Sequence, residues 1–185
     1  MVQESNQVNG GAMFLIRNLS GYSLDVLLGA IRSSVKSILF VEAAAGAKEH
    51  LSPRAKALLL KLEPWLIEKR FLWQEHGYSS FGYFFESSPE AVAIVLQESS
   101  TPTDWVYPQL FDNLNFLRDN GHSILYCSGM TDEVSLFLTS DELENFKSLG
   151  LFEAAQVLSF QEFLSDKSNE FSGGFNWDIV VGYGG

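Results

Sequence analysis

Apolar residues recur at helical spacing near the start of the chain, and they predict a first helix from Ser23 to about Lys36. A rival interpretation makes 37–41 (SILFV) a strand, because this short run is rich in branched and aromatic residues. The pattern leaves the continuation beyond Lys36 open. The residues on the helical stripe, separated by four, three, four and three positions, are Leu24, Leu28, Ile31, Val35 and Ile38.

A second helix is expected to begin after Ser52, whose hydroxyl can cap the free amides of a helix that has Pro53 at its first position. Pro64 lacks a backbone donor and should kink or divide this helix. Joined by a short turn, the two helices form an antiparallel hairpin. The apolar face of the second helix is formed by Ala55, Leu58, Leu59, Leu62, Leu66 and, at its far end, Trp73.

From Ser79 onward, aromatic strands alternate with capped helices. The strand SSFGYFFES leads to SPEAVAIVLQE, and EVSLFLTS leads to DELENFKSL. Residues 87–90 and 139–142 both match S/T-x-x-E, the capping box in which a hydroxyl and a carboxylate satisfy amides at a helix start. The sequence therefore predicts a repeated strand–cap–helix unit.

Other stretches complete the expected fold. Strands are predicted at 12–19, 123–128 and 177–183. Between the two repeats, leucines at helical spacing predict a further helix that stops at Asn120-Gly121; they are Leu110, Leu114 and Leu117.

The resulting fold class is α+β: a mixed sheet of about four or five strands with covering helices and an N-terminal helical hairpin. We expect a disordered leader at 1–11, then a single domain at 12–185. Within it, 12–78 is expected to be mainly helical and 79–185 to hold the strand–helix repeats.

Composition supports a self-sufficient core, since 46% of the 185 residues are hydrophobic and 15 are Phe. The start of the chain lacks the basic and apolar regions of a signal peptide, and the most apolar early stretch carries Arg32 and Lys36, so no membrane span is predicted. Cys127 is the one cysteine. A cytoplasmic protein is expected.

Charge is distributed unevenly along the chain. Residues 1–85 hold 9 Lys/Arg and 7 Asp/Glu, whereas residues 86–185 hold 3 and 16, so the second half carries the net acidity. Such a field repels nucleic acids and attracts a basic partner over long range. The alternative is that the acidity serves solubility alone.

Common catalytic and cofactor motifs fail on spacing. In HGYSSFG, the position two after Ser79 is Phe81, where a nucleophile elbow needs glycine. His122 and Cys127 are five apart, so on one strand their side chains point to opposite faces. The three histidines lie in separate segments, and the sequence has neither a phosphate-binding glycine loop with its lysine nor a calcium-loop pattern. We therefore predict no catalytic, metal or cofactor site from local motifs.

The carboxyl-terminal Gly184-Gly185 resembles a conjugation tail only superficially. A conjugation tail must protrude flexibly, whereas here an apolar strand runs almost to the end. We expect a chain end instead.

The leading hypothesis is a non-enzymatic interaction module whose acidic second half binds a basic protein, for example an immunity or inhibitor protein that neutralises a cationic toxin. A second hypothesis is a small-molecule-binding or enzymatic domain with a site assembled from distant segments, including Trp73, Tyr78, Tyr83 and His76. A third is a homo-oligomeric structural subunit formed through the helical hairpin. The predicted interface comprises two aromatic anchors and five carboxylates: Trp105, Tyr107, Asp132, Glu133, Asp141, Glu142 and Glu144.

Overall fold

The fold is taken from a computed structural model. It describes residues 13–17, 19–45, 51–75, 78–106, 109–128, 132–150 and 156–159. The expected leader at 1–11, the strand at 177–183 and Gly184-Gly185 lie outside these ranges.

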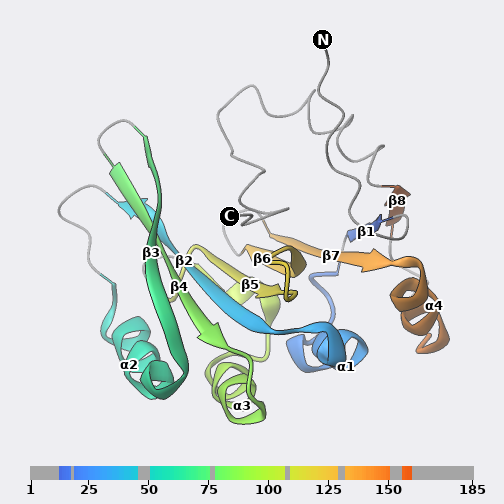
Figure 1. The fold of residues 1–185 in the computed structure, drawn as a ribbon, viewed down its shortest axis with the longest axis horizontal. Coiled ribbons are helices and arrows are strands. Elements are labelled where there is room, and N and C mark those ends of the chain that lie inside the picture. The colour runs from blue at the N-terminus through green and yellow to red at the C-terminus, as the bar shows by residue number, and fades with distance from the viewer. Residues whose placement is uncertain are drawn as a thin grey trace.

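An eight-stranded sheet forms the centre of the fold, with the strand order β3-β4-β2-β5-β6-β7-β1-β8 (Figure 1). Every pair of neighbours in it is antiparallel. Consecutive strands form hairpins at β3–β4, β5–β6 and β6–β7, whereas β1 lies between β7 and β8. The strands are β1 (Met13–Arg17), β2 (Ser37–Ala45), β3 (Leu66–Glu75), β4 (Tyr78–Glu86), β5 (Asn113–Leu117), β6 (Ser123–Ser128), β7 (Glu133–Thr139) and β8 (Gln156–Ser159).

Within the described ranges, four α-helices connect these strands: α1 (Leu24–Ile31), α2 (Pro53–Leu62), α3 (Pro89–Glu98) and α4 (Ser140–Ser148). Each begins at a hydroxyl residue that accepts a hydrogen bond from a first-turn amide, and α2 and α3 also have proline at their first position, where the missing N–H costs nothing. Three single 3₁₀ turns accompany them: η1 (Arg32–Ser34), η2 (Glu63–Trp65) and η3 (Pro102–Asp104).

The main core lies between the helices and one face of the sheet. Buried residues of all four α-helices share one cluster with the inward side chains of the strands. At its centre, the ring of Phe40 lies 4.8 Å from that of Phe111 and 5.1 Å from those of Phe85 and Trp105, measured between centroids. Such ring pairs add to the stabilisation from burial.

The opposite face, here called the second face, is also buried in the middle of the sheet. Leu39, Val41, Phe84 and Leu117 form a separate small cluster there. All residues of β5 and β6 are buried, so these strands bury side chains on both faces.

The α+β class is confirmed, as are the strands β1, β4, β6 and β7 and the helices α3 and α4. Thr139 and Glu142 form the expected capping box. The first repeat begins one residue later than predicted, because Ser88 rather than Ser87 caps α3.

The expected N-terminal helical hairpin and mixed sheet of four or five strands are wrong. The rival interpretation of 37–41 is the correct one: β2 follows η1, pairs with β4 and β5, and separates the two helices. Its alternate residues Ile38 and Phe40 join the helix-facing core, whereas Leu39 and Val41 point to the second face. As a result, α2 packs beside α3 instead of α1.

Two further segments expected to be helical are strands. The second helix ends at Leu62, Pro64 lies in η2, and the residues from Leu66 to Trp73 belong to β3. The leucines at 114 and 117 belong to β5, where they point to opposite faces of the sheet. The stretch 12–78, expected to be mainly helical, therefore contains β1, β2 and β3 besides α1 and α2.

Candidate interaction surfaces

The five predicted interface carboxylates form two groups separated by the length of β7. Asp132 and Glu133 lie where the strand begins, and Asp141, Glu142 and Glu144 follow its end on α4. Seven residues of extended chain span about 20 Å, so the two groups do not form one cluster.

Glu142 is not available to a partner, because its carboxylate is occupied inside the fold. Arg118 donates to both of its oxygens, and the Ser34 hydroxyl donates to Oε1 at 2.6 Å. The amide of Thr139 donates to Oε2 at 2.9 Å, which closes the capping box. Burial raises the pKa of this carboxyl, but these hydrogen bonds and the Arg118 charge outweigh it and lower the pKa to about 2.

Arg118 is a residue that the sequence reasoning missed. It also donates to the carbonyl of Phe137 at 2.8 Å, and thereby fixes the loop after β5 to the end of β7. The signal was present, since Arg118 is one of only three cationic side chains in 86–185. An isolated cation in an acidic half is a candidate for internal ion pairing.

Three of the predicted carboxylates, Asp132, Asp141 and Glu144, are exposed. Glu144 accepts a hydrogen bond from Lys147 at 2.7 Å, but 70% of its side chain remains accessible. Asp132 has a φ of 52°, the left-handed conformation that Asp tolerates in turns. These three carboxylates are therefore accessible to a partner.

The structure places one of the two predicted aromatic anchors inside the core. Trp105 is 0% exposed and packs against Phe40 in the main core, so its role as an accessible anchor is wrong. Its indole N–H is buried without a hydrogen-bond partner among the described residues. Tyr107 lies outside the described residues.

The charge asymmetry of the sequence becomes a charge polarity along the sheet. Residues 53–70, the basic end, hold five basic and two acidic side chains, and residues 132–148, the acidic end, hold one and five. The basic end comprises α2 and the edge strand β3, and the acidic end comprises β7 and α4 (Figure 1). Five strand spacings separate β3 from β7, which is about 24 Å.

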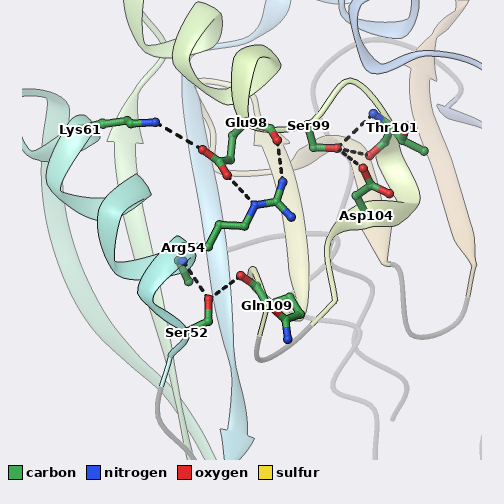
Figure 2. A network of polar contacts seen from close by, with 9 residues as sticks. Ser52, Arg54, Lys61, Glu98, Ser99, Thr101, Asp104 and Gln109 are labelled. Carbon is green, nitrogen blue, oxygen red and sulfur yellow. Dashed lines mark hydrogen bonds and ion pairs between the residues drawn. The ribbon is translucent and has the colours of Figure 1, made fainter.

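A polar network between α2 and α3 holds much of the basic end in place (Figure 2). Arg54 donates to the Glu98 carboxylate at 2.6 Å and to the Glu98 backbone carbonyl at 2.7 Å, and Lys61 approaches the same carboxylate. Burial raises the pKa of Glu98, but Arg54 and Lys61 outweigh this and lower it. Nearby, the Ser99 hydroxyl donates to Asp104 at 2.7 Å. These contacts serve helix packing.

The residues proposed for a pocket assembled from distant segments are not shown to converge. Tyr83 is buried in the main core, and its hydroxyl donates to Glu42 at 2.8 Å. Trp73 and Tyr78 lie on β3 and β4, and His76 lies outside the described residues.

The second face carries a buried polar stripe, but its groups satisfy one another. The Tyr126 hydroxyl donates to Asn113 at 3.0 Å, and the Ser123 hydroxyl donates to Asn115 at 3.3 Å. Burial raises the pKa of Tyr126, as does the nearby charge of Glu133. Such a network rigidifies the centre of the sheet.

Cys127 and His122 do not form a catalytic pair. Cys127 is fully buried in the main core, and burial raises the pKa of its thiol. His122 immediately precedes β6, and burial, followed by the Arg118 charge, lowers its pKa. The described residues contain no group of three or more His, Cys, Asp and Glu suited to a metal ion.

The chain matches no protein-family model, no curated protein and no solved structure. Within the described part, none of the helices has the length and apolar character needed to cross a bilayer.

Proposed function

We propose that the protein is a non-enzymatic interaction module that binds a basic protein through its acidic end. The observation that carries this proposal is the charge polarity of the sheet, because five acidic and one basic side chain at the acidic end lie across the sheet from five basic and two acidic side chains at the basic end. A polarised field both attracts a basic partner and orients it before contact.

The contact surface centres on α4, where Asp141 and Glu144 are exposed, and Asp132 adds to the field from the far end of β7. Glu142 holds the start of α4 through Arg118 and Ser34 instead of contacting the partner. The proposed contact surface is therefore a rigid helical face with exposed carboxylates. In the more specific form of the proposal, the partner is a cationic toxin such as a nuclease, and the carboxylates occupy the positions of substrate phosphates.

The first experiment captures partners from lysate of the native host on tagged protein at low salt and elutes them with a salt gradient. A basic protein released as salt rises is the expected result, since screening weakens attraction between exposed charges. An eluate without basic proteins would count against the proposal.

A matched pair of charge-reversed variants then locates the surface. D141K/E144K reverses two exposed acids of the acidic end, and D25K/E63K applies the same change in net charge elsewhere. Asp25, like Asp141, lies in the first turn of its helix. We expect the first variant to weaken capture at least tenfold and the second to weaken it much less. Equal losses would show that total charge, and not this surface, governs binding.

A further inference from the structure

The outer strand of the basic end, β3, is long and carries exposed apolar side chains. It has ten residues and stands at the margin of the described sheet, paired on one side with β4. Ile67 is 60% exposed and Phe71 is 52% exposed. An edge strand with these properties presents free backbone groups and apolar surface to another strand.

Charge along the middle of β3 follows a two-fold pattern. The sequence from Ile67 to Phe71 reads apolar, acidic, basic, basic, apolar, with Glu68 and Arg70 placed symmetrically about Lys69. Glu68 and Arg70 oppose Phe84 and Gly82 in the β4 ladder, so both lie on the second face and already form an ion pair with each other. A strand with this order is complementary in charge to a second antiparallel copy of itself.

Lys69, at the centre of the pattern, does not protect the edge in the usual way. Edge lysines prevent strand pairing when their ammonium groups stand at the open edge. Here the ammonium of Lys69 lies 4.5 Å from the ring centre of Phe81 and 4.6 Å from that of Tyr83, and 3.9 Å from the Glu42 carboxylate. The side chain is therefore folded back over the sheet toward β4 and β2, with an anion of its own chain beside it.

From these observations we infer that two copies of the chain pair through antiparallel β3 edges, with Lys69 opposite Lys69 of the second copy. In this register Glu68 of each copy faces Arg70 of the other, and Ile67 faces Phe71. The two-fold axis is perpendicular to the sheet, so the residues that meet lie on the same face. The result is one continuous antiparallel sheet across the two copies.

Neighbouring registers fit less well. In a continuous sheet, residues that oppose each other have side chains on the same face. The centre of the pairing can therefore move from Lys69 to Glu68 or to Arg70, but not to a point between two residues. A shift centred on Glu68 places two glutamates opposite each other, and a shift centred on Arg70 places two arginines opposite each other. Like charges directly opposite are destabilising, and each of the three registers has one such pair at its centre. In the register centred on Lys69, each ammonium group is turned back toward Glu42 of its own chain, and this register alone forms two opposite-charge pairs from Glu68 and Arg70.

The irregularities of β3 set the length of the pairing. The β3–β4 register shifts between Leu66 and Glu68 and again between Phe71 and Trp73. Such bulges bend and twist a strand, so regular pairing covers 68–70, and Ile67 and Phe71 meet at its two ends. A short segment predicts a weak, reversible dimer.

The test measures mass in solution by light scattering and sedimentation over a range of concentrations. The wild-type chain is expected to show a concentration-dependent monomer–dimer equilibrium. E68R places two arginines opposite each other in both contacts, and R70E does the same with two glutamates. We expect each variant alone to weaken the dimer roughly tenfold or more.

Mixing the two variants provides the decisive measurement. In a mixed dimer, the arginine introduced by E68R faces the glutamate introduced by R70E, and the unchanged Arg70 of the first copy faces the unchanged Glu68 of the second. Both contacts then join opposite charges, so dimerisation should recover to near the wild-type level. The ion pair between positions 68 and 70 of one chain is absent in both variants and cannot account for such recovery.

K56E, which changes an exposed charge on α2, serves as the control and should leave the equilibrium unchanged.

Several outcomes would overturn the inference. These are a monomer at every concentration, a wild-type dimer that survives both single variants, a mixture that stays monomeric, or growth into long assemblies, which indicates pairing between unlike edges. Capture of a basic partner by the acidic end is measured separately, so either proposal can fail without the other.

Discussion

Arg118 and Glu142 meet side by side, with the two guanidinium nitrogens Nη1 and Nη2 at 2.6 Å and 2.5 Å from the two carboxylate oxygens. The side chains are only 16% and 14% exposed. A bidentate pair of this kind is strong, and removal of either partner leaves a largely buried charge without its counterpart. The pair joins the loop after β5 to the first turn of α4.

Glu142→Gln should lower the free energy of unfolding at pH 7 by about 3 kcal/mol. The folded-state pKa of about 2 lies below the ordinary value of 4.5, so the stabilisation is complete above about pH 4.5 and is lost as pH falls toward 2. Denaturant titrations between pH 7 and pH 3 should therefore show the difference between wild type and variant shrinking with acidification. Glu144→Gln, at a 70% exposed position, is the control and should change stability by less than about 0.5 kcal/mol. A constant difference across this pH range would contradict the assignment.

Gly82→Ala should destabilise the fold by about 1–2 kcal/mol. A β-carbon at this position would lie 2.9 Å from Leu39 Cδ1, 3.0 Å from Phe84 Cε2 and 3.1 Å from Leu72 Cδ2. Leu39 is fully buried and has little room to move. Gly29→Ala is the matched substitution, because the added methyl on α1 meets nothing within 4 Å and helix propensity favours alanine by about 1 kcal/mol. Thermal unfolding of both variants should therefore show shifts of opposite sign.

Ser52→Ala should cost more stability than Ser88→Ala. Each serine caps a helix, which contributes about 1 kcal/mol. Ser52 also donates to the backbone carbonyl of Gln109 at 2.7 Å, and this bond ties the start of α2 to the segment before β5. Equal losses in urea titrations would mean that the second bond contributes nothing.

Cys127 should report global unfolding. Its thiol is completely buried, and burial raises its pKa. In the native state a reagent therefore cannot reach the sulfur, and the reactive thiolate does not form. With Ellman's reagent we expect negligible labelling at pH 8 in buffer and rapid, complete labelling in denaturant. Fast labelling under native conditions would place Cys127 in a segment that opens locally.

The sequence predicted the helices that begin with a capping residue. The hydroxyl caps before α2, α3 and α4 stand at the predicted helix starts to within one residue, because capping depends on a few adjacent positions. Periodicity failed where strands are buried on both faces. In β5, Leu114 belongs to the main core and Leu117 to the cluster on the second face, but their three-residue spacing is also the spacing of one face of a helix.

The candidate surfaces depended on contacts distant in sequence, which a local pattern does not contain. The capping box predicts a local role for Glu142 that Asp141 lacks, but the contacts with Arg118 and Ser34, which are distant in sequence, could not be predicted from it. Trp105 follows the polar stretch 99–104, yet it fills the space beside Phe40. The edge position of β3 is likewise hidden in the sequence, because the spacing of its apolar residues favours a helix.

The position of β1 in the sheet has a consequence for synthesis on the ribosome. Met13 pairs with Thr139, so the first strand of the described fold must wait for β7 before its ladder can form. Strands β2, β3 and β4 have neighbours close in sequence and can associate while translation continues. For most of elongation the apolar segment around Ile16 therefore lacks both of its described strand partners, β7 and β8.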